Sequence, residues 1–295
     1  MSFEVVAPEF ERIVSPGTPI QRIEADCIFG EGPVWNAREQ YFLWTDIVGD
    51  RMYRWTPDEG VTLFRAPTGH ANGTTYDRQG RLVVAGWGAR TIWRLEPDGR
   101  AVILASHYQG QKINTPNDIV VKSDGAIYWT DTVGALFICG MCGEDVQRYL
   151  DTCPVFRLSP DGATLTPVID DFANPNGLAF SPDESLLYVN DTTRRHIRVF
   201  DVQPDGSVAN GRVFYEDHGT EPGNPDGMKV DVEGNVYCTG SGGIHVINPN
   251  GRLLGIIKLH PVTNMAWGDA DWRTLYVTGR AEFYRLRLNI PGVPV

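Results

Sequence analysis

The sequence predicts an all-β protein, a six-bladed β-propeller whose ring is closed by an N-terminal strand that completes the last blade. Three observations lead to this fold class. One pattern of short apolar runs and turn residues recurs six times along the chain. No segment keeps an apolar period of 3.6 residues, which argues against long helices. The 32 glycines and 20 prolines are spread throughout, as expected where turns join many short strands.

Each repeat unit begins with a polar residue, followed by a small residue and an alternating apolar run. A turn and a second apolar run follow, often with a third strand that ends in Pro-Asp-Gly. The six units begin at Glu31, Asn72, Asn117, Asn176, Asp226 and Asn264. Consecutive unit starts are 38 to 59 residues apart. This spacing is typical of propeller blades, which take about 40–50 residues each.

The two ends of the chain predict how the ring closes. The sixth unit stops near Leu288 and is one strand short, whereas residues 10–23 belong to no unit. We therefore expect one strand from residues 10–23 to complete the last blade, which removes the open edges of the array. Residues 1–295 would then form a single propeller domain, a length that all-β folds often reach as one unit.

Charge and composition argue against several classes of partner and location. The net charge is −11 and no basic stripe offsets it, which disfavours nucleic acid. No stretch approaches the roughly 18 apolar residues of a membrane span. The N-terminus, MSFEVVAPEF, lacks the basic and apolar segments of a signal peptide. With five cysteines, an odd number, we expect a reduced, cytoplasmic protein.

The first residues of the six units share one chemistry, because each carries a carboxylate or a carboxamide. Equivalent positions of all blades lie on one ring around a propeller axis, so these side chains should meet where the inner strands begin. Asn or Asp before Gly is also common in turns, which would explain any single position. Turn preference does not explain Glu31, however. A ring of oxygen ligands suits a hard divalent cation.

Four segments resemble the signatures of the gluconolactonase/regucalcin (senescence marker protein) family, namely FGEGPVW, TPNDIVV, NPNGLAFSPD and NPDGMKVD. The wider relatives of this family include the diisopropylfluorophosphatases. The resemblance extends from about residue 29 to residue 280. It implies a hydrolase that opens a sugar-acid or related small lactone at one divalent ion in the channel. Calcium is the first expectation for that ion, with Mg²⁺, Mn²⁺, Zn²⁺ and Fe²⁺ as alternatives.

The resemblance also implies roles for individual ring residues. Glu31, Asn176 and Asp226 would be metal ligands, and Asp226 would in addition be the catalytic base or nucleophile. Asn117 would be a fourth ligand, or would hold the substrate or a water. In this interpretation the ion polarises the lactone carbonyl and stabilises the oxyanion that forms.

Three further positions are expected to contact the substrate. Asn72 and Asn264 fall outside the family's usual ligand set and are assigned to the wall of the site. Thr115 stands two residues before Asn117, where some members of the family carry an arginine that grips a sugar-type substrate. The substrate end of the site therefore departs from the family pattern.

An insertion in the third unit, TVGALFICGMCGEDVQRYLDTCP, is a second departure. Its thiols, Cys139, Cys142 and Cys153, could bind a metal ion or form a redox pair, but a zinc site would need a fourth ligand at a suitable spacing. We interpret the segment as a lid loop with buried or incidental thiols, which could shape substrate choice.

Three aspartates follow a strand in their units, namely Asp46, Asp131 and Asp191. We interpret them as turn or inter-blade hydrogen-bonding residues. Two functional alternatives remain open for the ring itself. The first is phosphotriester or organophosphate hydrolysis at the same ion. The second is a calcium-binding or protein-binding propeller without turnover, which should expose an apolar patch.

Overall fold

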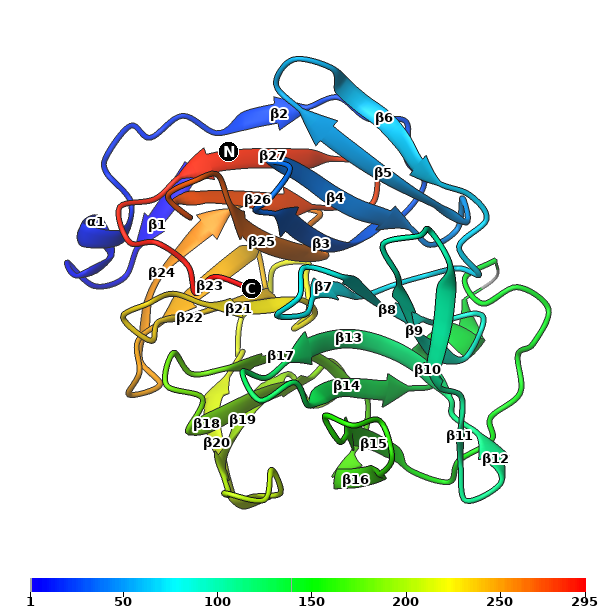
Figure 1. Ribbon diagram of the computed structural model, residues 1–295. Coiled ribbons are helices and arrows are strands. Elements are labelled where there is room, and N and C mark those ends of the chain that lie inside the picture. The colour runs from blue at the N-terminus through cyan, green and yellow to red at the C-terminus, as the bar shows by residue number, and fades with distance from the viewer. Residues whose placement is uncertain (1, 139) are drawn as a thin grey trace.

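The computed structural model of the protein describes residues 2–138 and 140–295. Six antiparallel sheets stand around a central channel, which confirms the predicted fold class (Figure 1). In each blade the first strand of the repeat unit lies innermost and the later strands of that unit follow outward, because short turns join antiparallel neighbours. No helix among the described residues is long and apolar enough to cross a membrane.

The blades are numbered here in chain order. Blade 1 consists of β3 (Gly30–Asn36), β4 (Tyr41–Asp46), β5 (Arg51–Thr56) and β6 (Gly60–Arg65). Blade 2 consists of β7 (Thr74–Tyr76), β8 (Leu82–Gly86), β9 (Thr91–Leu95) and β10 (Ala101–Ala105). Blade 3 consists of β13 (Thr115–Val121), β14 (Ile127–Thr132), β15 (Cys153–Leu158) and β16 (Leu165–Phe172). Blade 4 contains β17 (Pro175–Phe180), β18 (Leu186–Asp191), β19 (His196–Val202) and β20 (Val208–Glu216). Blade 5 contains β21 (Met228–Val230), β22 (Val236–Gly240), β23 (Gly243–Ile247) and β24 (Leu253–Lys258). Blade 6 contains β25 (Asn264–Gly268), β26 (Thr274–Thr278) and β27 (Phe283–Arg287). Outside these sheets lie the hairpin of β11 (His107–Tyr108) and β12 (Gln111–Lys112), and the 3-10 helix η1 (Gly134–Phe137).

The N-terminal segment closes the ring, as predicted. β2 (Gln21–Ile23) pairs antiparallel with β27 and becomes the outermost strand of blade 6. The sequence did not predict β1 (Ser2–Val5), which pairs with β24 and adds a fifth strand to blade 5. Between these two strands, the short helix α1 (Phe10–Ile13) buries Phe10 and Ile13 in a core cluster. Both ends of the chain thus contribute to blade 6.

Aromatic packing holds the first blade against the last, whose strands lie side by side in Figure 1. The ring centroids of Trp44 and Phe283 are 4.8 Å apart, and those of Phe42 and Tyr276 are 4.7 Å apart. All four side chains are buried. Aromatic pairs of this kind add about 0.5–1.5 kcal/mol each beyond the area that they bury. The junction between blade 1 and blade 6 is therefore a continuous part of the hydrophobic core.

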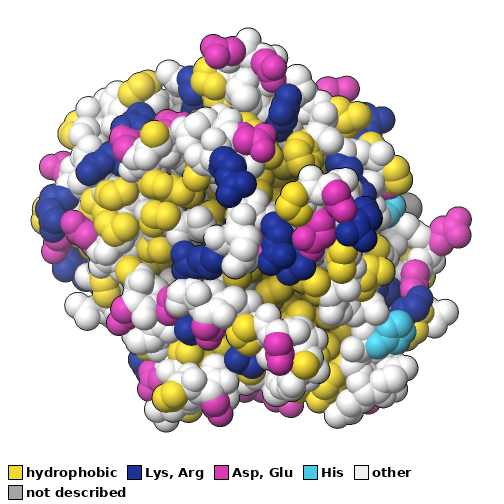
Figure 2. Space-filling view, in the orientation of Figure 1, with side chains coloured by type: hydrophobic (Ala, Val, Ile, Leu, Met, Phe, Trp, Pro, Cys, Tyr) yellow, Lys and Arg dark blue, Asp and Glu magenta, His cyan; other side chains and the backbone are white. Residues whose placement is uncertain are grey.

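The C-terminal tail covers the end of the channel that faces the viewer in Figure 1. Gly292 lies against the indole of Trp267 so closely that a Cβ would come within 1.8 Å of the ring. The Val293 N–H donates to the carbonyl of Val230 at 3.2 Å. Beside the tail is a cavity of about 340 Å³, with Phe180 and Trp267 in its wall. Figure 2 shows hydrophobic and basic side chains together near the middle of this face.

A glycine follows the first residue of four units, and the close approach of the next blade explains why. A Cβ on Gly73 would lie 2.4 Å from the carbonyl oxygen of Asn117, and one on Gly177 would lie 2.2 Å from that of Asp226. The N–H groups of the two glycines donate to the same carbonyls at 2.8 and 2.9 Å. Neighbouring inner strands are thus pinned together at the level of the predicted ring.

This close approach makes Gly177→Ala a test of the inter-blade contact. We expect the substitution to lower the free energy of unfolding by about 3 kcal/mol, because the new methyl group would push blade 5 away from blade 4. Gly162→Ala is the control, since a Cβ there meets nothing within 4 Å and only its positive φ of 72° is unfavourable, at about 1–2 kcal/mol. Urea unfolding measures both variants, and equal losses would contradict the packing argument.

Candidate active site

The structure brings the six predicted ring residues to one end of the channel, opposite the C-terminal tail. Each lies within or just before the innermost strand of its blade, close to the point where that strand begins. Five of these side chains are buried and one, that of Asp226, is partly exposed. The buried members are Glu31, Asn72, Asn117, Asn176 and Asn264.

Hydroxyl groups from the second strands fix the backbone of the ring. Thr45 of β4 donates to the carbonyl of Asn72 at 3.1 Å, and Thr130 of β14 donates to that of Asn176 at 2.7 Å. In both pairs the donor belongs to one blade and the acceptor to the next. The ring residues are consequently held by rigid strands of two blades, which is the support that a precise binding site needs.

Glu31 uses one of its carboxylate oxygens for hydrogen bonds within the protein. Its Oε2 accepts hydrogen bonds from the Gly32 N–H at 2.8 Å and from Asn264 Nδ2 at 3.0 Å. Among the described residues, no donor reaches Oε1. Glu31 could therefore bind a cation through Oε1 while its orientation is fixed through Oε2.

Two amides form a second pair across the ring. Asn72 Nδ2 donates to Asn117 Oδ1 at 2.9 Å, which joins blades 2 and 3. The Oδ1 atom of Asn72 is buried and has no hydrogen-bond partner among the described residues. An unpaired buried carbonyl oxygen is unfavourable, and a bound cation, water or substrate hydroxyl would satisfy it.

Asp226 is anchored through its backbone, and the Asn176 side chain interacts with its carboxylate. Its N–H donates to Thr239 Oγ1 at 2.8 Å, and its carbonyl accepts from the Gly177 N–H at 2.9 Å and from Asn190 Nδ2 at 2.6 Å. The neighbouring Asn176 side chain donates to Thr192 Oγ1 at 3.1 Å. The backbone of Asp226 is therefore fixed from both blade 4 and blade 5.

Sequence reasoning missed an ion pair that lies directly beside the ring. Asp118 occupies the position that is glycine in four other units, and its side chain is buried. The Nζ atom of Lys229, from β21, lies 3.7 Å from Asp118 Oδ2 and 3.4 Å from Asn264 Oδ1. Two signals in the sequence point to this pair: Asp in the place of Gly, and a single lysine inside an otherwise apolar inner strand.

The carboxylates of the channel disfavour one another's ionised forms. Burial, and then the charge of Asp118, raise the pKa of Glu31 to about 7, although the Asn264 amide, the Gly32 N–H and Lys229 act in the opposite direction. Burial and the charges of Glu31 and Asp118 raise the pKa of Asp226 well above its ordinary value. These are the shifts expected of buried groups of like charge.

Charge and donor chemistry at the ring fit one divalent cation. Three carboxylates and one ammonium leave the channel at −2 when all are ionised, and one divalent ion would neutralise that charge. The free oxygens of Glu31 and Asn72 are both hard ligands. The described residues contain no group of three or more His, Cys, Asp or Glu side chains that could hold a metal ion. Any ion at the ring would therefore use amide oxygens beside Glu31 and Asp226.

Thr115 lies beside the ring but its hydroxyl is engaged within the blade. The side chain is fully buried, and Oγ1 donates to the carbonyl of Thr132 on the neighbouring strand.

The three aspartates that follow strands are also engaged with the backbone, as predicted. Asp46 accepts the N–H groups of Ile28, Phe29 and Gly49 at 3.0–3.1 Å. Asp131 and Asp191 accept those of Asn114 and Ala173, both at 2.8 Å.

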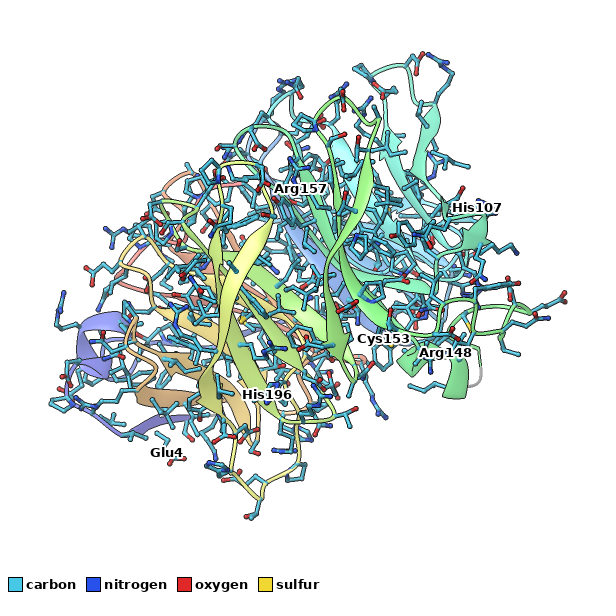
Figure 3. All side chains as sticks on the ribbon, turned by 90° about the horizontal axis from the view of Figure 1, so that it is seen from below. Glu4, His107, Arg148, Cys153, Arg157 and His196 are labelled. Carbon is cyan, nitrogen blue, oxygen red and sulfur yellow. The ribbon has the colours of Figure 1, made fainter. Side chains whose placement is uncertain are left out.

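The insertion of blade 3 lies on the face of the molecule that carries the ring. Figure 3 shows Arg148 and Cys153 at this face together with His196, the first residue of β19, whereas Arg157 lies farther towards the opposite face. From blade 3 the insertion reaches across to blades 1 and 2. There Met141 and Cys142 pack in a buried cluster. The other buried members of that cluster are Ile47 and Trp87.

Arg90 of blade 2 holds the base of this insertion. Its side chain is buried and donates to the carbonyls of Asn114, Asp145 and Gln147 at 2.7–2.9 Å. The insertion is thus docked beside the channel mouth, in the position expected of a lid. Of the three predicted thiols, Cys142 and Cys153 are buried, and Cys139 lies outside the described residues.

Fold and site together define the class: a six-bladed propeller with carboxylates and carboxamides gathered at one end of its channel. Residues 29–281 match the family model described as the SMP-30/Gluconolactonase/LRE-like region. The chain belongs to this family, which confirms the resemblance found in its sequence.

Individual relatives agree with this assignment. A gluconolactonase of Zymomonas mobilis is 33% identical over 97% of this chain and 86% of its own length. A pentonolactonase of Haloferax volcanii is 27% identical over 87% of this chain and 83% of its own length. The solved structure of a gluconolactonase from Xanthomonas campestris superimposes with a TM-score of 0.89, with 32% identity over 98% of this chain and 95% of that one.

Proposed function

We propose that this protein is a metal-dependent lactonase that opens a sugar-acid or related small lactone. The observation that carries the proposal is the pair of Glu31 and Asp226, two carboxylates at the channel mouth whose pKa values are raised by burial and by neighbouring negative charge. Relatives that share a third of the sequence or somewhat less are named gluconolactonase and pentonolactonase. Their names support the reaction class.

The proposed ligands are Glu31, Asn176, Asp226 and Asn117, which contribute oxygen atoms only. A divalent ion bound by them would supply a Lewis acid for the lactone carbonyl. The Asn72–Asn117 amide pair and Asn264 would line the wall against which the substrate lies. Calcium suits an irregular set of oxygen ligands best, because it accepts six to eight of them in loose geometry.

Asp226 would act as the general base. Its carboxylate takes a proton from the water that attacks the lactone carbonyl carbon, and the new C–O bond gives a tetrahedral oxyanion. When the ring C–O bond breaks, the protonated Asp226 returns that proton to the departing alkoxide. The product is the open-chain hydroxy acid. The fixed backbone of Asp226 suits this role, because a base must stay within hydrogen-bond reach of water in both steps.

A panel assay with metal-stripped protein tests the proposal. The protein is freed of ions with a chelator and then supplied in turn with Ca²⁺, Mg²⁺, Mn²⁺, Zn²⁺ or Fe²⁺. Hexono- and pentonolactones are assayed beside a phosphotriester and a phosphofluoridate. We expect lactone hydrolysis that depends on the added ion. Turnover of the phosphorus esters alone would favour organophosphate hydrolysis, and tight ion binding without turnover would favour a non-catalytic propeller.

A further inference from the structure

The ammonium group of Lys229 lies among oxygen atoms from three blades. Its Nζ is 3.0 Å from the carbonyl oxygen of Met228 in blade 5, 3.4 Å from Asn264 Oδ1 in blade 6 and 3.7 Å from Asp118 Oδ2 in blade 3. A backbone carbonyl, an amide oxygen and a carboxylate are all ligands that Ca²⁺ accepts. The lysine thus fills a position whose surroundings resemble those of a bound metal ion.

The positive charge of Lys229 compensates the carboxylate of Asp118. Asp118 is buried, and an ionised carboxylate that is buried without a partner is strongly destabilising. Lys229 supplies the opposite charge from a strand two blades away. Once Asp118 is neutralised in this way, the charges of Glu31 and Asp226 remain at the ring, and their combined charge matches a single divalent ion.

Lys229 also fixes the amide of Asn264. The Oδ1 atom of Asn264 accepts from the Met265 N–H at 2.8 Å as well as from Lys229. Its Nδ2 is therefore turned towards two carboxylates and donates to Glu31 Oε2 at 3.0 Å and to Asp118 Oδ2 at 3.4 Å. This contact leaves Glu31 Oε1 for the cation, so the lysine acts on the ring through Asn264.

We propose that Lys229 is a tethered counter-ion that fills a second cation position beside the ring and thereby limits the channel to one divalent ion. This inference rests on the proposed ion at Glu31 and Asp226. Lys229 is accordingly a positioning residue: it sets how many ions the channel takes and how Glu31 is oriented.

The number of bound ions tests the inference without any activity assay. Isothermal titration of the metal-stripped full-length protein with MnCl₂ is expected to give one ion per chain. Lys229→Met should bind two ions, because Asp118, Asn264 and the Met228 carbonyl are then open to a second. Adding Asp118→Asn to Lys229→Met should return the number to one. Lys229→Arg, which keeps the charge, is the matched control and should also bind one.

Affinity provides a second test that does not depend on the folding of Lys229→Met. Asp118→Asn alone leaves the ammonium unpaired and should weaken Mn²⁺ binding at the ring by about tenfold or more, through repulsion. The double variant should bind Mn²⁺ about as tightly as the wild type.

Three results would count against particular parts of this scheme. A Lys229→Met protein that folds and binds one ion would overturn the inference, as would an Asp118→Asn protein with unchanged affinity. A wild-type protein that binds no Mn²⁺, Ca²⁺ or other divalent ion would instead refute the proposed metal site itself.

Discussion

Asp226→Asn is expected to abolish divalent-metal binding and to lower kcat by about three orders of magnitude or more. The change removes one of the two carboxylates at the ring and also the proposed base. It leaves the backbone anchors of Asp226 in place, because Thr239, Gly177 and Asn190 form hydrogen bonds with its main-chain atoms. Calorimetric titration with Mn²⁺ and steady-state kinetics on the preferred lactone measure the two effects separately.

Glu221→Gln is the matched control for this variant. Glu221 belongs to the same loop and carries the same charge, but it is exposed and pairs with Lys258 at 2.6 Å, away from the ring. Loss of an exposed pair has little effect, so metal affinity and kcat should stay within about twofold of the wild type. An Asp226→Asn enzyme with full activity would remove Asp226 from the mechanism.

Metal ions are expected to stabilise the protein much more at about pH 8 than at about pH 5. In the folded, metal-free protein, burial and like charge raise the pKa values of Glu31, to about 7, and of Asp226. The unfolded chain has ordinary carboxyl pKa values near 4. The folded state therefore binds more protons than the unfolded state between about pH 4 and pH 7. The contribution of these two carboxylates to the free energy of unfolding of the metal-free protein therefore falls as the pH rises through this window.

A divalent ion reverses that trend because it replaces the protons. Thermal unfolding followed with chelator or with saturating Ca²⁺ should show a small shift of the melting temperature at low pH and a shift of several degrees at high pH, since saturation at 100 times Kd adds about 2.7 kcal/mol. Glu31→Gln should lose most of the shift. Equal shifts at both pH values would contradict the assignment of Glu31 as a ligand.

Much of the fold could be predicted because the repeat places the same chemistry at the same point of each unit. The polar first residue marked the start of every inner strand, and the missing strand of the sixth unit pointed to β2. β1 could not be predicted in this way. It is a fifth strand on a blade whose repeat unit already supplies four, so no missing strand in the repeat pattern predicts it.

The candidate site was predicted less completely, since part of it depends on contacts between distant segments. Asp118 and Lys229 belong to blades 3 and 5, and only the assembled ring brings them together. The hydroxyl of Thr115 bonds within its own sheet, which its position in the sequence does not reveal. The docking of the insertion likewise depends on the backbone carbonyls that Arg90 reaches.

The C-terminal tail affects the end of the channel from which a substrate can reach the ring. The C-terminal tail lies over one end, with Gly292 against Trp267, and the pair of Lys229 and Asp118 stands between that end and the ring. The ring lies at the opposite end of the channel from the tail. In the proposed reaction the lactone arrives and the hydroxy acid departs through the same opening, beside the insertion of blade 3. Product that lingers there would exclude the next substrate molecule, so the hydroxy acid should be a competitive inhibitor of its own formation.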